Sequence, residues 1–219
     1  SRGLGDVYKR QDIAAAFAGT VTQHTGTVTI TNNDYTVAEL KAINNATNGD
    51  ITLNSAGVAI SGTVANIKAA FAGTITEHTG TVTISDANAE NITATDITSI
   101  NTTNTGTITV SNAIDINGSG SEVAAAFAAI DNNTGNATAN VTGNDYTVAQ
   151  LKAINAATDG AIVLANAGVA ISGTVANIKA AFAGTVTEHT GTVTISDAGE
   201  VNITATDITS INTTNTGTI

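Results

Sequence analysis

The chain has no cysteine, proline, methionine or tryptophan among its 219 residues, and aromatic residues make up only 3%. Without cysteine it can form no disulfide, no zinc–thiolate site and no thiol nucleophile. With so few aromatics, the interior must be filled by Ala, Val, Ile and Leu. Such a composition suits a thin, regular core with many equivalent positions.

Positive charge is also scarce. Lys and Arg total 7 against 18 Asp and Glu, for a formal net charge of −11, and Arg2, Lys9 and Arg10 all fall in the first eleven residues. An acidic surface repels phosphate backbones, so we expect no nucleic-acid partner. No apolar run is long enough to cross a bilayer, so we expect no membrane insertion in this segment.

The sequence that is present is a repeat. Residues 60–108 (the first copy) and 171–219 (the second copy) lie 111 positions apart and are identical at 45 of 49 positions. Inside this super-repeat, phrases such as "TVAELKAI", "TVANIKAAF" and "TATDITSI" recur about every 27 residues, each followed by a glycine-containing turn and an alternating run such as "TVTI". About eight such units are present, a spacing typical of stacked repeat architectures.

Each unit predicts one helix and one strand. The phrases carry apolar residues three apart, as on one face of a short helix, with Thr, Ser or Asp before them as N-caps. These stripes are Val37/Leu40/Ile43, Val64/Ile67/Ala70 and Val148/Leu151/Ile154. The runs alternate with period two, as a strand does. Their inward pairs are Val28/Ile30, Ile51/Leu53, Val82/Ile84, Ile108/Val110, Ile162/Leu164 and Val193/Ile195.

Strand, helix and strand running in one sense require parallel pairing. We therefore predict an α/β solenoid: a parallel β-sheet with one short helix per coil of about 27 residues, in about eight coils. Residues 57–61 and 113–117 could add a second strand per coil. The alternative fold is then a β-solenoid (β-helix) with single-turn helices.

The repeat defines the expected organisation. We expect a solenoid array over residues 12–219, cut at both ends. Residues 1–11 match no unit, and "DVYKRQ" resembles the translated end of a sequencing-library adapter. We therefore expect residues 1–11 to be a non-repeat artefact on a metagenomic fragment, and we exclude them from fold reasoning.

The stretches "ISGTVANIKAAFAGT", "YTVAELKAINNATNGDITL" and "TATDITSINTTNTGTITVS" resemble the tandem repeats of giant Thr/Ala/Asn-rich bacterial cell-surface proteins. These are adhesin-like or surface-layer-like chains of the marine cyanobacterial type. The resemblance implies a secreted, surface-attached molecule in which this segment is structural or adhesive. It implies as partners the neighbouring repeats of the same chain, and surface glycans or other cells.

The Asn- and Asp-rich turns raise calcium as a cofactor. It takes 6–8 oxygen ligands, and Asn- and Asp-rich turns offer them, although the same residues also form turns without any ion. No spacing here matches a calcium-binding loop, so we expect no metal or cofactor, and the weak calcium candidates are Asp86, Glu90 and Asp131.

Threonine-bearing strands give the alternative function, an ice- or carbohydrate-binding face. Outward positions pair Thr with Thr in several runs, although Ala161 and Val163 break the pattern and Thr favours strands in any case. The candidate ligand face is Thr27, Thr29, Thr81, Thr83, Thr107, Thr109, Thr192 and Thr194.

The remaining polar residues predict no enzyme. His24, His78 and His189 share one loop position, which we expect to be solvated. The lysines share one helix position, which we expect on the outer face, paired weakly with acids: Lys41, Lys68, Lys152 and Lys179. No Ser–His–Asp order, phosphate loop or carboxylate pair is visible, so we expect no catalysis in this segment.

Overall fold

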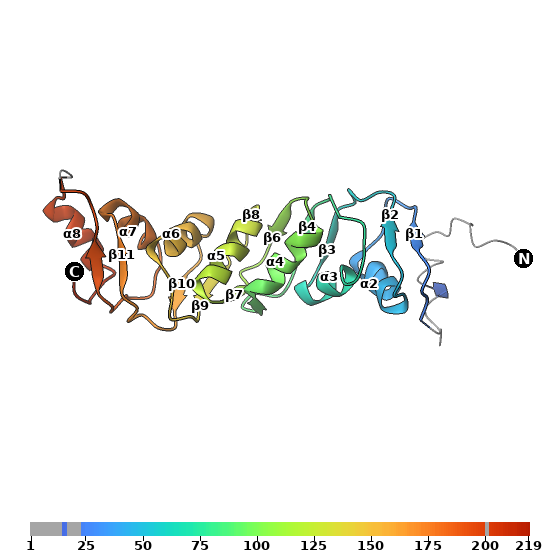
Figure 1. Ribbon diagram of the computed structural model, residues 1–219, viewed down its shortest axis with the longest axis horizontal. Helices are drawn as coiled ribbons and strands as arrows, with labels where there is room; N and C mark the ends of the chain where they lie inside the picture. Colours follow the sequence, from blue (N-terminus) through green and yellow to red (C-terminus); the bar gives the residue numbers. More distant parts are fainter. Residues whose placement is uncertain (1–14, 17–22, 200–201) are drawn as a thin grey trace, which may run out of the picture. The chain divides into compact units, whose positions relative to one another are not determined.

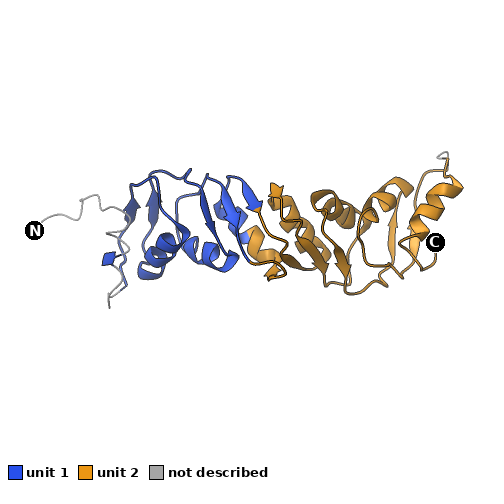
Figure 2. Ribbon diagram, turned by 180° about the vertical axis from the view of Figure 1, so that it is seen from behind, with its two compact units in different colours: residues 1–86, 99–109 blue, residues 87–98, 110–219 orange. Residues whose placement is uncertain are grey.

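The computed structural model describes residues 15–16, 23–199 and 202–219. The chain divides into two compact units, residues 1–86 with 99–109 and residues 87–98 with 110–219 (Figure 2). In both, short parallel strands alternate with short helices, and the described strands close no barrel (Figure 1). The predictions for residues 1–11 lie outside the described residues.

Two short strands lie between most consecutive helices, whereas the sequence predicted one strand per unit. The elements of unit 1 are β1 (Val28–Ile30), α2 (Val37–Ala46), β2 (Ile51–Leu53), β3 (Ile60–Gly62), α3 (Val64–Ala70) and β4 (Val82–Ile84). Helix α4 (Ala94–Thr103) and strand β6 (Ile108–Val110) contribute residues to both units. Those of unit 2 are β5 (Asn91–Thr93), β7 (Asp115–Gly118), α5 (Gly120–Ala129), β8 (Asn132–Asn133), β9 (Thr138–Val141), α6 (Val148–Ala157), β10 (Ile162–Leu164), β11 (Ile171–Gly173), α7 (Val175–Ala181), β12 (Val193–Ile195) and α8 (Ala205–Asn212).

Strand pairing in each unit is parallel and follows the repeat. In unit 1, β1 pairs with β2 and β3 with β4; in unit 2, the order is β10-β9-β7-β5, with a separate pair β11-β12. Paired residues lie 22 to 24 positions apart, as in Ile60↔Val82 and Asn91↔Asp115. Each of these strands therefore pairs with a strand of a neighbouring sequence unit. The predicted parallel alternation of strand and helix is confirmed.

Six of the described helices begin at a Thr or Ser N-cap. In α2, the Thr36 side chain accepts from the Glu39 N–H while the Glu39 carboxylate accepts from the Thr36 N–H, a reciprocal capping box. The three predicted apolar stripes are all buried. The helices run to 7–10 residues, which is two to three turns. The extra strands β3 and β7 do form near the suggested positions, but the single-turn helices of the alternative fold do not form among the described residues.

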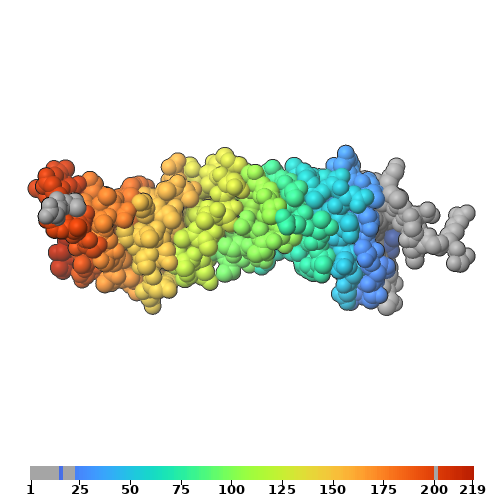
Figure 3. All heavy atoms as spheres, turned by 45° about the horizontal axis from the view of Figure 1, so that its top comes forward, coloured from blue at the N-terminus to red at the C-terminus, as the bar shows by residue number. Residues whose placement is uncertain are grey.

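The core is thin and aliphatic. Most described strands place alternate side chains inward, as in β1, where Val28 and Ile30 are buried and Thr29 is exposed. Five of the six predicted inward pairs are fully buried, and Ile195 of the sixth is half-buried. Within each unit the sequence colours form successive bands on the face shown (Figure 3). No helix among the described residues is both long and apolar enough to cross a membrane.

Candidate functional site

The most organised polar cluster surrounds a buried histidine in unit 1. His78 is 0% exposed and follows α3 on the way to β4. Its Nδ1 lies 2.6 Å from Asn104 Oδ1, and its Nε2 lies 2.8 Å from the Val58 carbonyl oxygen. The His78 N–H donates to the Thr103 carbonyl, and the His78 carbonyl accepts from the Thr105 N–H. Ring and backbone together tie two successive sequence units to each other.

The orientation of Asn104 is fixed by its other contact. Its Nδ2 donates to the Gly106 carbonyl at 2.6 Å, so Oδ1 is the atom that faces the ring. Both ring nitrogens of His78 therefore face oxygen acceptors.

Aromatic rings close the cluster from the apolar side. The Phe71 ring lies 5.5 Å from the His78 ring, and the Tyr35 ring 6.3 Å from it, edge-on. The Tyr35 hydroxyl donates to the Ser55 carbonyl at 2.9 Å. Burial raises the pKa of Tyr35 to about 12. The imidazole is thus shut away from solvent and from any small-molecule substrate.

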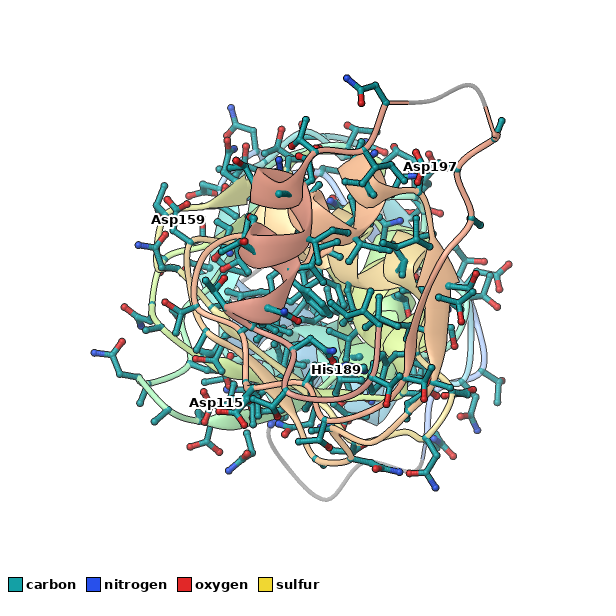
Figure 4. All side chains as sticks on the ribbon, turned by 90° about the vertical axis from the view of Figure 1, so that its left-hand side faces the viewer. Asp115, Asp159, His189 and Asp197 are labelled. Atoms are coloured by element: carbon teal, nitrogen blue, oxygen red, sulfur yellow. The ribbon has the colours of Figure 1, made fainter. Side chains whose placement is uncertain are left out.

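Unit 2 repeats this cluster residue for residue. His189 is also 0% exposed, with Nδ1 2.6 Å from Asn215 Oδ1 and Nε2 2.8 Å from the Val169 carbonyl (Figure 4). Phe182 and Tyr146 take the places of the two aromatic rings. Burial likewise raises the pKa of Tyr146 to about 12. The interaction is therefore a property of the repeat unit.

The prediction that the histidines lie in solvated loops is wrong for His78 and His189. His24 alone is partly exposed, and its Nδ1 lies 3.4 Å from Thr47 Oγ1, because threonine stands where the other copies have asparagine. The sequence feature that marks the buried histidines is the asparagine of "TTNTG", which follows each of them by 26 residues. A search for metal ligands overlooks this asparagine.

The three calcium candidates, Asp86, Glu90 and Asp131, lie in different surroundings. Asp86 is 7% exposed, and its Oδ2 accepts from the Val64 N–H at 2.8 Å, at the start of α3. Asp197 does the same for Val175 at 2.7 Å. Glu90 and Asp131 are exposed. Among the described residues, no three His, Asp or Glu side chains gather into a possible metal site. Asp86 serves as a helix cap supplied by the following sequence unit.

The candidate threonine face is distributed over three sheets. Thr27 and Thr29 belong to the β1–β2 region. The β3–β4–β6 region holds Thr81, Thr83, Thr107 and Thr109, and the β11–β12 region holds Thr192 and Thr194. The exposed members are Thr27, Thr29, Thr81, Thr192 and Thr194, and the half-buried members are Thr83, Thr107 and Thr109. These threonines lie on the outward side of their strands, as predicted, but they do not form one row on a single sheet.

The lysines bridge consecutive helices. Lys41 of α2 donates to Asn66 Oδ1 of α3 at 2.7 Å, and Lys152 of α6 donates to Asn177 Oδ1 of α7 at 2.8 Å. Lys179 of α7 instead forms an ion pair with Asp207 of α8, at 2.7 Å. Lys179 and the hydroxyl of the helix cap Thr204 hold the pKa of Asp207 well below its usual range. The expected partners were acids; in two of these three cases the partner is an amide.

Comparison with family models, with curated proteins and with solved structures gave no match. Fold and site therefore rest on the residues of this chain. Its recurring polar groups are directed at the next sequence unit: Asn44 Nδ2 donates to the Ala69 carbonyl at the end of α3, and Asn155 Nδ2 to the Ala180 carbonyl of α7. What this arrangement does chemically is to join one repeat unit to the next.

Proposed function

We propose that this chain is a structural and adhesive repeat segment of a giant secreted bacterial surface protein, built as an α/β solenoid and without catalysis of its own. One observation carries the proposal. The polar groups that recur at the 111-residue spacing are used between successive sequence units, as in the pairs His78–Asn104 and His189–Asn215.

The mechanism is geometric. A repeat unit that buries its apolar face only against its neighbour adds length without needing a new core, and identical units stack with identical contacts. A surface repeated many times also multiplies weak binding, because each further contact of a tethered array becomes intramolecular. The partners we propose are the neighbouring repeats and, on the outer face, surface glycans or other cells.

The outer surface supports recognition of neutral ligands rather than polyanions. The net charge of −11 disfavours phosphate backbones and anionic lipid surfaces. Exposed Thr and Asn side chains offer hydrogen bonds in both directions, as sugar hydroxyls require.

Binding to glycan arrays and to whole bacterial cells tests the adhesive part. We expect weak binding by the single chain and much stronger binding by chains that carry several super-repeats. Equal binding by both would contradict an avidity mechanism. Catalytic turnover that survives purification to homogeneity would contradict the absence of catalysis.

The second candidate is an ice- or carbohydrate-binding strand face. Strand register favours it locally, since Thr29 lies opposite Thr52 and Ser61 opposite Thr83. Thr81→Tyr with Thr83→Tyr would block such a face while leaving the inward residues intact. Thermal hysteresis or glycan binding that this double variant abolishes would support it; no activity in the unmodified chain, or none lost in the variant, would exclude it.

A further inference from the structure

Two identical segments of unit 2 differ in their surroundings. Residues 91–93 and 202–204 both read Asn-Ile-Thr and both precede the phrase "ATDITSIN". The first forms β5, which pairs in parallel with β7. The second precedes α8 directly but belongs to none of the described strands.

Burial follows this difference in pairing. Ile92 of β5 is 6% exposed, whereas the equivalent Ile203 is 36% exposed. Ala94 is fully buried, whereas the equivalent Ala205 is exposed. The residues of the two segments are the same, and the difference in burial accompanies the difference in pairing: β7 covers β5, whereas none of the described strands pairs with residues 202–204.

The segment that covers β5 is defined by its contacts. Ile116 lies opposite Ile92 in the parallel register, and the Asp115 N–H donates to the Glu90 carbonyl at 2.9 Å. Asn117 Nδ2 donates to Asn91 Oδ1 at 3.2 Å. Gly118 brings the backbone so close that a Cβ there would lie 3.1 Å from the Ala94 Cβ.

The chain turns from this strand into α5 at once. Ser119 and Glu122 form a capping box, which fixes where the helix begins. Strand β7 and helix α5, residues 115–129, are therefore one strand–helix unit. Its sequence pattern, an inward-facing isoleucine followed by Gly-Ser, is the pattern that pairs with β5.

We propose that residues 202–204, with the first turn of α8, form a docking edge for a further strand–helix unit with the sequence pattern of residues 115–129. The incoming strand adds in parallel, with its isoleucine opposite Ile203 and its asparagine against Asn202. This inference rests on the solenoid part of the proposed function and names the partner of that edge. It requires nothing of the adhesive part.

The absence of cysteine from the chain makes the test direct, since a single introduced thiol is unique. Ile219 is the repeat equivalent of Ile108, so residues 109–141 can be appended after Ile219 in register. Ile203→Cys reports on the edge, and Ile92→Cys, at the covered equivalent, is the matched control. The rate of thiol modification is measured in the original and the extended chain, with circular dichroism to confirm folding.

We expect Ile203→Cys to be modified at least about tenfold more slowly in the extended chain, and Ile92→Cys to stay protected in both. Ile116→Asp in the appended copy should restore fast modification. Equal rates in the original and extended chains would overturn the proposal, as would protection that survives Ile116→Asp. Protection of the original chain that grows with its concentration would assign the edge to a second copy and overturn it too. Loss of glycan or cell binding alone would leave this inference standing.

Discussion

At the scale of single residues, the buried histidines are the most constrained polar groups of the chain. Each ring makes two hydrogen bonds to oxygen and two aromatic contacts with no exposed surface. A buried donor that loses its acceptor has neither water nor a protein group as a hydrogen-bond partner, and this destabilises the folded state. The asparagine that faces each ring is therefore as important as the histidine.

We predict that Asn104→Leu lowers the free energy of unfolding by about 1–3 kcal/mol, because His78 Nδ1 and the Gly106 carbonyl both lose their partner. Urea denaturation measures the change. Asn101→Leu, on the exposed side of α4, is the matched control and should change stability by less than about 0.5 kcal/mol. Equal effects of the two substitutions would show that the His–Asn pair carries no special stability.

Alkaline pH tests the buried tyrosines. The folded pKa of Tyr35 and of Tyr146 is raised to about 12 from 10.0. Between these values the unfolded chain releases its tyrosine protons while the folded chain keeps them. The stability that the two tyrosines contribute is therefore fully present below pH 10 and is lost as the pH rises towards 12. Urea denaturation from about pH 9 to about pH 11 should show this decline, and Tyr35→Phe with Tyr146→Phe should flatten it. An unchanged slope in the double variant would contradict the assignment.

At the scale of elements, the turns stack as closely as the strands. A Cβ on Gly106 would lie 2.2 Å from the Gly80 carbonyl oxygen, and Gly217 stands in the same relation to Gly191 at 2.1 Å. Both are backbone contacts that no side-chain rotation can relieve. The glycines of these "Thr-Gly" turns are thus required by the backbone of the preceding sequence unit.

We predict that Gly106→Ala destabilises the chain by about 1–3 kcal/mol, since the turns must move apart. Gly199→Ala is the matched control, because nothing lies within 4 Å of a Cβ there. Thermal unfolding followed by circular dichroism compares them. The stacking account fails if both variants melt together with the original chain.

Much of the element pattern could be predicted from the sequence. The stripe Val37/Leu40/Ile43 and the alternation at β1 depend only on local periodicity, and both are buried as expected. The His78–Asn104 pair could not be predicted in the same way. It joins residues 26 positions apart, and only the register of the turn decides that the histidine points inward.

The calcium and threonine candidates show the same limit. Asp86 stands in an acid-rich turn, yet its carboxylate caps a helix of the preceding unit, a partner that local composition does not reveal. Thr29 and Thr83 share an outward position on their strands, but whether they share a sheet depends on which strands pair. The alternation of residues indicates which way a side chain points, whereas the pairing of distant strands decides which side chains lie next to one another.

At the scale of the whole molecule, our central proposal is that the repeats stack as a solenoid, each unit held by the next. The direct measurement is small-angle X-ray scattering of chains with one, two and three super-repeats of 111 residues. Strands spaced about 4.8 Å apart predict that the maximum dimension grows by a constant increment of roughly 20 Å per added super-repeat. An increment that shrinks with each addition, as in a compact globule, would contradict the account.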